Sequence, residues 1–559
     1  AEATTAATLE ADQRLGSLSA LHLAQALLQR RWRDPPPAWL VTRGAQPAGV
    51  EGSPLSVAQA PLWGLGRTLA MEHPELGCAR VDIDPAWTGE EAARALLGAI
   101  ASDDGEDQVA LRTDGRYVAR LARSSFAACA SAAQRGAGAA PAQPVVRADG
   151  TYLIAGGLGG LGLGLAEWLV AQGARHLALV GRSGAPEAAR AAIAAMQERG
   201  ARVLALQGDV SRPDDVARVL AEIDAQLPPL RGVVHAAMVL EDSTALSLDA
   251  ERFRRVMAPK VQGAWLLHEA TRARALDFFV MYSSAAALLG PSGQGSYAAA
   301  NAFLDALAHH RRALGLPALA IDWGMFSEAG GVARRGLGDR LSHRGIGAIT
   351  PAQGLEVLGR LLAGAPPQIA VLRLDLRQWL EFYPSAAGAP FLSALRREER
   401  RGAPEASRAP RLREALIEAE PGERSRLLEE HLKEELGRVI HLRASMIDGA
   451  ATFSSLGVDS LMGLELRNRL EASLGVRLSV ALLFAYPTVA SLAQHLLDRM
   501  ALPAASSPPP PPPSADERAS GDGAAPEAQL SREEIFALLD ESLNRVNDRR
   551  DEIPGSETP

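Results

Sequence analysis

Six short apolar runs, each followed by a stretch with helical periodicity, constrain the fold of this chain more than any other feature. They lie between residues 151 and 322 and read TYLIA, HLALV, RVLAL, GVVHAA, DFFVMYSS and PALAID. Continuous apolar strands that alternate with helices are typical of a parallel sheet covered on both faces. The pattern therefore predicts an α/β, doubly wound, Rossmann-like fold for this region.

Segments of low complexity divide the 559 residues into parts. Small, aperiodic or proline-rich composition predicts linkers at 125–148, 383–411 and 501–529. The segments between them predict an α/β piece at 1–124 with strands AWLVT, CARVDI and QVALR, the doubly wound domain at 149–382, a helical domain at 412–500 and a single helix at 530–549.

Composition excludes several classes of protein. The formal net charge of −8 argues against nucleic acid as the main partner, and no apolar run approaches the roughly 20 residues that a membrane-spanning helix needs. Two cysteines, Cys78 and Cys129, cannot form a disulfide framework, and no signal peptide opens the chain. We expect a cytoplasmic protein with no metal site. Because the chain starts without methionine, we expect it to be part of a longer protein.

A glycine-rich turn follows the first apolar run. Gly157, Gly159 and Gly162 fit the pattern G-x-G-x-x-G between a strand and a helix. Such glycines let the backbone approach a pyrophosphate at a helix N-terminus, although a plain structural turn is the alternative in a chain with 52 glycines. The expected cofactor-binding residues of this turn are Gly156, Gly157, Gly159, Gly160, Leu161 and Gly162.

Residues after the second and third runs indicate which dinucleotide binds. Arg182, followed by Ser183, stands twenty residues beyond Gly162, where an NAD-dependent enzyme carries an acidic residue. A guanidinium suits a 2′-phosphate, so the sequence favours NADPH. Asp209 and Val210 follow the third run and are candidates to contact the adenine. For Asp209 a helix cap or a turn is an equal alternative.

Tyr297 lies in the alanine-rich run GQGSYAAANAFLDAL, with Asn301 one helical turn later. A phenol has an unperturbed pKa of about 10, so a proton donor at neutral pH needs a neighbour that stabilises the phenolate. The chain has only two lysines, Lys260 and Lys433. Lys260 precedes the strand that ends at Ser284 and can supply that cation. Taken one at a time, these residues also have structural explanations. Ser284 can cap the end of a strand and Tyr297 can be a core residue. Asn301 can be a polar residue on a helix face, and Lys260 can be a solvated charge.

Together these residues resemble the catalytic ketoreductase domain of modular type I polyketide synthases, in which the lysine comes from an earlier helix. The resemblance implies that Tyr297 protonates the substrate carbonyl and Ser284 hydrogen-bonds it. It also implies that Lys260 lowers the pKa of the tyrosine and contacts the nicotinamide ribose, and that Asn301 supports the proton relay. Residues 1–124 resemble the structural subdomain of such reductases without its first portion.

The resemblance also implies a stereochemical class. Leu240, Glu241 and Asp242 stand where many members have Leu-Asp-Asp, and Leu289 stands where the opposite class tends to carry Trp. This is similar to a B-type enzyme, which gives a D-configured hydroxyl. Ala299 is not the proline that marks epimerising members.

The region 412–500 contains amphipathic segments expected to form a small four-helix bundle. Its sequence FSSLGVDSLMGLEL resembles an acyl carrier protein, which implies that Ser460 receives 4′-phosphopantetheine from a pantetheinyl transferase. A phosphodiester at a helix N-terminus is electrostatically favourable. A helix-starting serine without modification is the alternative.

The C-terminal segment LSREEIFALLDESLNRV predicts a helix with an apolar stripe and a capping box of Ser531 and Glu534. By resemblance it is a docking segment for the next synthase subunit, whereas self-association and an unstructured tail are alternatives. The expected docking residues are Ile535, Leu538, Leu539, Leu543 and Val546.

The resemblance implies that a β-ketoacyl thioester on Ser460 is reduced with NADPH to a β-hydroxyacyl thioester. No thioesterase follows in the sequence, so we expect transfer to a downstream subunit. Other implied partners are the upstream ketosynthase and acyltransferase domains of the same module and a second copy of the chain in a homodimer. The rival hypothesis is a non-reducing scaffold and carrier that keeps the reductase fold for structure alone.

Overall fold

The computed structural model describes residues 4–500, apart from 31–34, 50–54, 103, 125–145, 328–344, 403–411, 413–415, 418, 441, 477, 479–481 and 483–484. The proline-rich linker at 501–529 and the expected docking helix at 530–549, with Ile535, Leu538, Leu539, Leu543 and Val546, lie outside the described residues. Within the described part, no helix combines the length and apolar character needed to span a bilayer.

A seven-stranded, all-parallel sheet forms the centre of the catalytic region, in the order β12-β10-β9-β8-β5-β6-β7. Its strands are β5 (Thr151–Ala155), β6 (His176–Gly181), β7 (Arg202–Gln207), β8 (Leu230–His235), β9 (Phe278–Ser284), β10 (Leu319–Trp323) and β12 (Gln368–Val371). The first six coincide with the six apolar runs, which confirms the Rossmann-like fold. The edge strand β12 was not expected, because QIAV is short and only partly buried.

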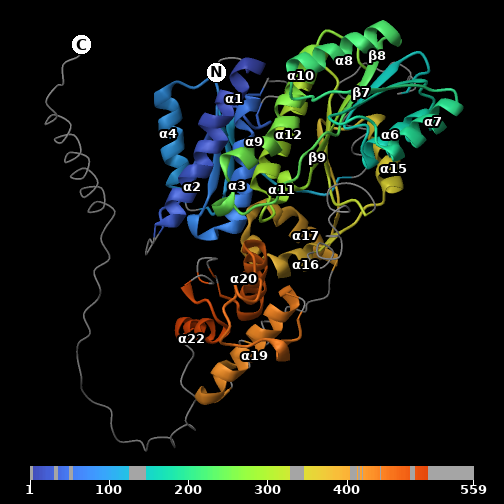
Figure 1. Ribbon diagram of the computed structural model, residues 1–559. Helices are drawn as coiled ribbons and strands as arrows, with labels where there is room; N and C mark the ends of the chain where they lie inside the picture. Colours follow the sequence, from blue (N-terminus) through green and yellow to red (C-terminus); the bar gives the residue numbers. More distant parts are fainter. Residues whose placement is uncertain are drawn as a thin grey trace, which may run out of the picture. The chain divides into compact units, whose positions relative to one another are not determined.

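Helices cover both faces of this sheet (Figure 1). One face packs on α6 (Gly160–Ala171), α7 (Glu187–Glu198) and α15 (Pro351–Leu362). The other packs on α8 (Pro213–Gln226), α9 (Ala250–Lys260), α10 (Gln262–Thr271) and α12 (Gly295–Ala313). The short helix α11 (Ala286–Leu289) lies between β9 and α12. Because both faces are covered, the central strand β5 is buried along its whole length, whereas the edge strand β7 is partly exposed.

Residues 4–124 build a second, four-stranded sheet in the order β1-β2-β3-β4, with β4 antiparallel to β3. The strands are β1 (Trp39–Arg43), β2 (Ala79–Ile83), β3 (Gln108–Arg112) and β4 (Gly115–Val118). The helices are α1 (Ala6–Gln13), a π-helical turn (Arg14–Leu18), α2 (Ser19–Gln29), α3 (Pro61–Glu72) and α4 (Gly89–Ile100). The three expected strands of this piece are confirmed.

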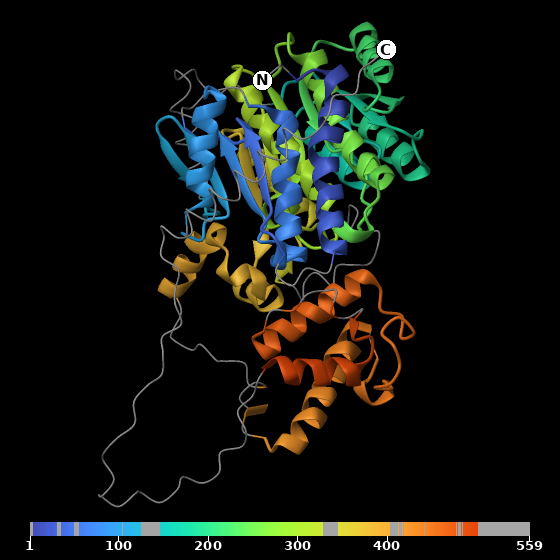
Figure 2. The ribbon, with the colours of Figure 1, turned by 90° about the vertical axis from the view of Figure 1, so that its left-hand side faces the viewer.

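The two α/β halves meet where α3 packs along α12, and Figures 1 and 2 show the N-terminal helices running beside α12. Gly64 of α3 makes this close approach possible. A Cβ atom at position 64 would lie 2.2 Å from the carbonyl oxygen of Ala298, next to Tyr297. Gly64, which lies inside α3, therefore serves the packing of this helix on α12.

Residues 376–402 form a packed layer, although the sequence-based prediction ended the catalytic domain at 382 and assigned 383–411 to a linker. They form α16 (Leu376–Phe382), two 3-10 turns (Pro384–Gly388 and Pro390–Leu392) and α17 (Ser393–Gly402). Their aromatic side chains explain why: Trp379, Tyr383 and Phe391 are buried in one cluster with Leu289. The proline and arginine content concealed this packed layer.

The carrier region has helices α19 (Pro421–Ile440), α20 (Ser460–Leu474) and α22 (Val489–Met500), and a 3-10 turn at Ala444–Met446. They share one apolar core with Leu428, Leu436, Leu470, Leu492 and Leu496 at its centre. The four-helix bundle stays a prediction, because much of 477–484 lies outside the described residues.

Gly64→Ala should destabilise the protein by about 2–3 kcal/mol, because the added methyl group forces α3 away from α12. The matched control is Gly98→Ala in α4, where a Cβ has no neighbour within 4 Å and should be neutral or stabilising by up to about 1 kcal/mol. Urea unfolding of both variants measures the difference. Equal stability of the two variants would contradict the close packing of α3 on α12.

Candidate active site

The glycine-rich turn lies at the carboxyl end of β5 and leads into α6. Gly156 has φ +85°, a left-handed conformation that favours glycine. A Cβ at Gly162 would lie 2.3 Å from the carbonyl oxygen of Gly156. Gly159 is the N-cap of α6 and has no side chain to cap it, so the backbone N–H groups at the start of the helix stay available to an anion. The turn has the shape and polarity that a pyrophosphate requires.

Arg182 and Ser183 directly follow β6, where Ser183 is exposed and Arg182 lies at the protein surface. None of the ion pairs among the described residues includes Arg182. A guanidinium at the end of the second strand suits a 2′-phosphate. These residues therefore fit NADPH as the sequence predicted.

Asp209 and Val210 follow β7. The Oδ1 atom of Asp209 accepts hydrogen bonds from Ser211 N (2.9 Å) and Ser211 Oγ (2.6 Å), which forms the kind of turn that was the alternative for this aspartate. Val210 is buried, and its side chain lies against Gly263 at the start of α10. The structure shows a structural role for both residues, and their contact with adenine stays a prediction.

The four expected catalytic residues come from three separate elements and lie together. Lys260 ends α9, Ser284 ends β9, and Tyr297 and Asn301 occupy successive turns of α12. The Nζ atom of Lys260 lies 5.5 Å from the centroid of the Tyr297 ring and donates a hydrogen bond to the carbonyl oxygen of Tyr282 (2.7 Å). Asn301 Nδ2 donates to the carbonyl oxygen of Tyr297 (2.7 Å).

Burial sets the electrostatics of this group. It lowers the pKa of Lys260, whose side chain is 2% exposed, to about 7. It also raises the pKa of Tyr297, while hydrogen bonding to Ser284 and Asn301 opposes the rise. The expected lowering of the tyrosine pKa is therefore not what the structure shows. The ammonium lies 5.5 Å from the centroid of the ring, and desolvation of the phenolate is the largest effect on its pKa.

The expected stereocontrol residues divide into two groups. Leu240, Asp242 and Leu289 line the same cavity as Tyr297 and Ser284. Glu241 instead forms a two-point ion pair with Arg255 of α9, at 3.0 and 2.9 Å. Sequence reasoning singled out the tripeptide but did not separate the residues that line the cavity from the one that pairs with a helix.

Several lining residues were missed at the sequence level. Gln294 Nε2 donates to Asp242 Oδ1 (3.2 Å), and the sulfur of Met238 lies 4.0 Å from the hydroxyl of Tyr297. Trp323 and Trp379 also line the cavity. Trp323 directly follows the predicted strand PALAID and pairs with Ser284 in the sheet, so its position was a usable signal.

Ser460 is the first residue of α20, and Asp459 caps the helix by accepting a hydrogen bond from Met462 N (2.7 Å). The following backbone N–H groups and the helix dipole make this terminus favourable for a phosphodiester. Among the described residues no cluster of His, Cys, Asp or Glu has the arrangement of a metal site.

Family models match three parts of the chain. Residues 1–121 match the "Polyketide synthase extender module SpnB, Rossmann fold domain", 150–328 the "KR domain" and 430–496 the "Phosphopantetheine attachment site". These ranges lie inside 1–124, 149–382 and 412–500. A ketoreductase domain uses NADPH, and a carrier domain holds 4′-phosphopantetheine covalently.

Known relatives agree with these matches. The chain is 42% identical over 370 residues to a phenolphthiocerol/phthiocerol polyketide synthase of Mycobacterium tuberculosis, covering 66% of this chain and 17% of that protein. It is 37% identical over 472 residues to polyketide synthase GfsA of Streptomyces halstedii, covering 82% of this chain and 6% of that protein. The chain therefore spans a small part of these relatives.

Two solved structures share the fold. The "Structure of A1-type ketoreductase" is 35% identical with a TM-score of 0.60, covering 69% of this chain and 78% of that chain. The "Structure of A-type Ketoreductases from Modular Polyketide Synthase" is 36% identical with a TM-score of 0.60, covering 67% and 76%.

Gly162→Ala should weaken NADPH binding at least about tenfold, because its methyl group would displace the carbonyl of Gly156 from the turn. Gly164→Ala, two residues further along α6, has open space around its Cβ and is the matched control. Fluorescence titration with NADPH compares them, and circular dichroism checks folding. Equal affinity of both variants would show that this turn does not hold the dinucleotide.

Proposed function

The chain belongs to the ketoreductase-containing modular polyketide synthases, and from this premise we propose that it reduces a β-ketoacyl thioester held on Ser460 to the β-hydroxyacyl thioester. The observation that carries the proposal is the position of Lys260. It stands 37 residues before Tyr297 in the sequence, yet its ammonium lies 5.5 Å from the centre of that ring. This separation in sequence and proximity in space match a cation that assists a proton-donating phenol.

NADPH supplies a hydride to the carbonyl carbon when it is bound. Tyr297 donates its hydroxyl proton to the carbonyl oxygen, and the hydroxyl of Ser284 donates a hydrogen bond to the same oxygen. The phenol stays protonated before the reaction because burial raises its pKa. Lys260 then stabilises the phenolate that remains, and Asn301 holds the turn of α12 that carries Tyr297.

The proposed cofactor site combines the glycine-rich turn after β5 with Arg182, which follows β6. Gly156 and Gly162 admit the pyrophosphate, Gly157, Gly159, Gly160 and Leu161 continue the same turn, and the open N-terminus of α6 carries positive partial charge. Arg182 binds the 2′-phosphate, which makes NADPH the preferred dinucleotide.

For the product we propose the D-configured hydroxyl of a B-type enzyme. Leu240 and Asp242 lie in the cavity beside Tyr297, and Leu289 occupies the position at which the opposite class tends to carry Trp. The two solved structures described above are named A-type, so the local residues and the overall similarity point to different classes. We weight the local residues because they line the cavity in which the ketone must orient.

The carrier region takes part through Ser460. We propose that a pantetheinyl transferase modifies this serine and that upstream ketosynthase and acyltransferase domains build the ketoacyl chain on it. The reduced product then passes to a downstream subunit, with the synthase acting as a homodimer. The position of Ser460 at the N-terminus of α20 supports the attachment step.

Tyr297→Phe should abolish reduction of a short β-ketoacyl thioester, because the phenylalanine ring has no proton to donate. We expect a loss of at least about a hundredfold, the range of general acid catalysis. Tyr117→Phe, on the exposed face of β4, is the control and should keep the wild-type rate. NADPH absorbance gives the rate, and chiral chromatography of the wild-type product should show the D-hydroxyl.

An inactive wild-type protein, or undiminished activity of Tyr297→Phe, would refute the reductase proposal and leave a scaffold and carrier. An L-configured product would refute only the B-type assignment.

Incubation with coenzyme A and a pantetheinyl transferase should add one phosphopantetheine mass to the wild-type protein and none to Ser460→Ala. Ser455→Ala, in the loop before α20, is the matched control and should still be modified. Intact mass spectrometry reads the result. Modification of Ser460→Ala would show that another residue carries the acyl chain.

A further inference from the structure

Two buried carboxyl groups lie beside the catalytic residues and have no role in the reaction described above. Asp305 follows Tyr297 and Asn301 at four-residue intervals, so all three occupy one face of α12. Asp322 lies on β10 directly opposite Ser283 of β9. The side chains are 6% and 0% exposed, respectively. Buried acids require a reason, since each charged carboxylate is costly to remove from water.

The two carboxyls share their immediate neighbours. They are close enough to hydrogen-bond to each other, and the Ser283 hydroxyl contacts both. Ser283 Oγ also donates to the carbonyl oxygen of Asn301 (3.3 Å), and Gln368 Nε2 donates to Asp322 Oδ2 (2.8 Å). The pair is thus linked by hydrogen bonds to the helix turn that carries Tyr297.

No cation forms an ion pair with Asp305 or Asp322 within 4.0 Å among the described residues. Arg67 of α3 is the nearest arginine that influences both, but its guanidinium donates to Gln108 Oε1 (2.9 Å) and the carbonyl oxygen of Ala287 (2.7 Å). Two adjacent buried carboxylates without a paired cation cannot both stay ionised, so one of them holds a proton.

Burial and the neighbouring Asp322 raise the pKa of Asp305 well above its usual range. Burial raises the pKa of Asp322 to about 6. At neutral pH, one carboxyl of the pair is therefore protonated and the other carries the charge. Both carboxyls raise the pKa of Lys260 against the lowering caused by burial.

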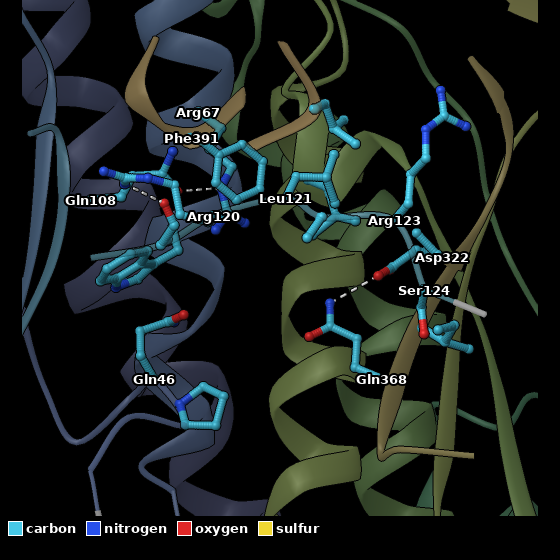
Figure 3. Close-up of a pocket in the computed structure, with 18 of the residues that line it drawn as sticks. Gln46, Arg67, Gln108, Arg120, Leu121, Arg123, Ser124, Asp322, Gln368 and Phe391 are labelled. Carbon is cyan, nitrogen blue, oxygen red and sulfur yellow. Dashed lines mark hydrogen bonds between the residues drawn. The ribbon is translucent and has the colours of Figure 1, made fainter. Parts of the chain in front are cut away.

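Asp322 also adjoins a cavity that is separate from the catalytic cleft. With Gln368 and Arg67 it lines a cavity of about 1010 Å³, and Figure 3 shows the hydrogen bond between Gln368 and Asp322 at its wall. None of the four catalytic residues lines this cavity.

We propose that Asp305 and Asp322 are positioning residues that share one proton, and that their single negative charge keeps the Lys260 ammonium charged beside Tyr297. The inference rests on the proposed role of Lys260 in the reduction. It explains how a lysine that is 2% exposed, with a backbone carbonyl as its hydrogen-bond acceptor, stays protonated at the pH where the enzyme works. The titratable groups that face the pair or Lys260 are Arg67 of α3, His235 of β8, Tyr282 of β9, Tyr297 of α12 and, through Gln368, His309 of α12.

A shared proton makes a sharp prediction for asparagine variants. Asp305→Asn and Asp322→Asn each leave one carboxyl, which ionises because its like-charged neighbour is gone. The net charge of the pair is therefore unchanged in either single variant. Only the double variant Asp305→Asn/Asp322→Asn removes the negative charge near Lys260.

The test is the pH dependence of single-turnover reduction, measured by rapid mixing with NADPH and a β-ketoacyl thioester. Lys260 is charged below its pKa, so the rate falls as pH rises through that value. Each single variant should keep the wild-type midpoint within about 0.5 pH unit. The double variant should lose rate at a pH about one to two units lower, which is the shift that one charge roughly 6–12 Å away produces at an effective dielectric near 20.

At pH values below its shifted midpoint, the double variant should recover a rate within about threefold of wild type. Loss of rate at all pH values with an unchanged midpoint would show a structural role and overturn the proposal. A full shift in either single variant would also overturn it, because it would mean that the two carboxyls do not share a proton. Thermal unfolding checks folding, and the single variants decide the question if the double variant does not fold.

Failure of the proposed function gives a different result. Wild-type protein without reductase activity leaves no pH profile to compare, and a Tyr297→Phe variant as fast as wild type shows that the profile does not report on proton donation by Tyr297.

Discussion

Everything proposed for this protein depends on one buried ammonium group held against one phenol ring. Lys260 lies at the end of α9 and Tyr297 in the first turn of α12, and these helices pack on the same face of the seven-stranded sheet. Burial works against both charged forms, the ammonium of Lys260 and the phenolate of Tyr297. An ammonium 5.5 Å from the ring centroid stabilises the phenolate once the proton has left. The arrangement therefore favours the charge state that exists just after proton transfer, which is where catalysis needs stabilisation.

The N-terminal half contributes to this site through packing rather than chemistry. Gly64 lets α3 approach the backbone of α12 next to Tyr297. From the same helix, the Glu72 carboxylate accepts hydrogen bonds from the backbone of Ala245 and of Gly293, which precedes α12. A second, four-stranded α/β unit thus fixes the helix that carries the proton donor and the loops around it. This explains why a structural subdomain without reactive residues belongs to the reductase.

Much of the fold and of the site was predictable from local pattern. Apolar runs predicted six strands. The positions of the glycine-rich turn, Ser284, Tyr297 and Asn301 relative to these strands predicted that they lie at one edge of the sheet. Lys260 stood out because lysine is so rare in the chain.

The packed layer at 376–402 was missed because its buried aromatics lie among prolines and arginines. The pair of Asp305 and Asp322 was missed because the two residues meet only through tertiary packing. The raised pKa of Tyr297 was missed because the sequence does not show how deeply a ring is buried.

The most direct test of the central claim is an NMR titration of the lysine side chains. The chain has two lysines, so labelling them selectively gives two signals, and Lys433→Arg identifies the one from Lys260. The account predicts that the Lys260 signal titrates near pH 7 and that Tyr297→Phe perturbs it. A Lys260 signal that titrates at the ordinary lysine value of about 10.4 and ignores the tyrosine substitution would contradict the account.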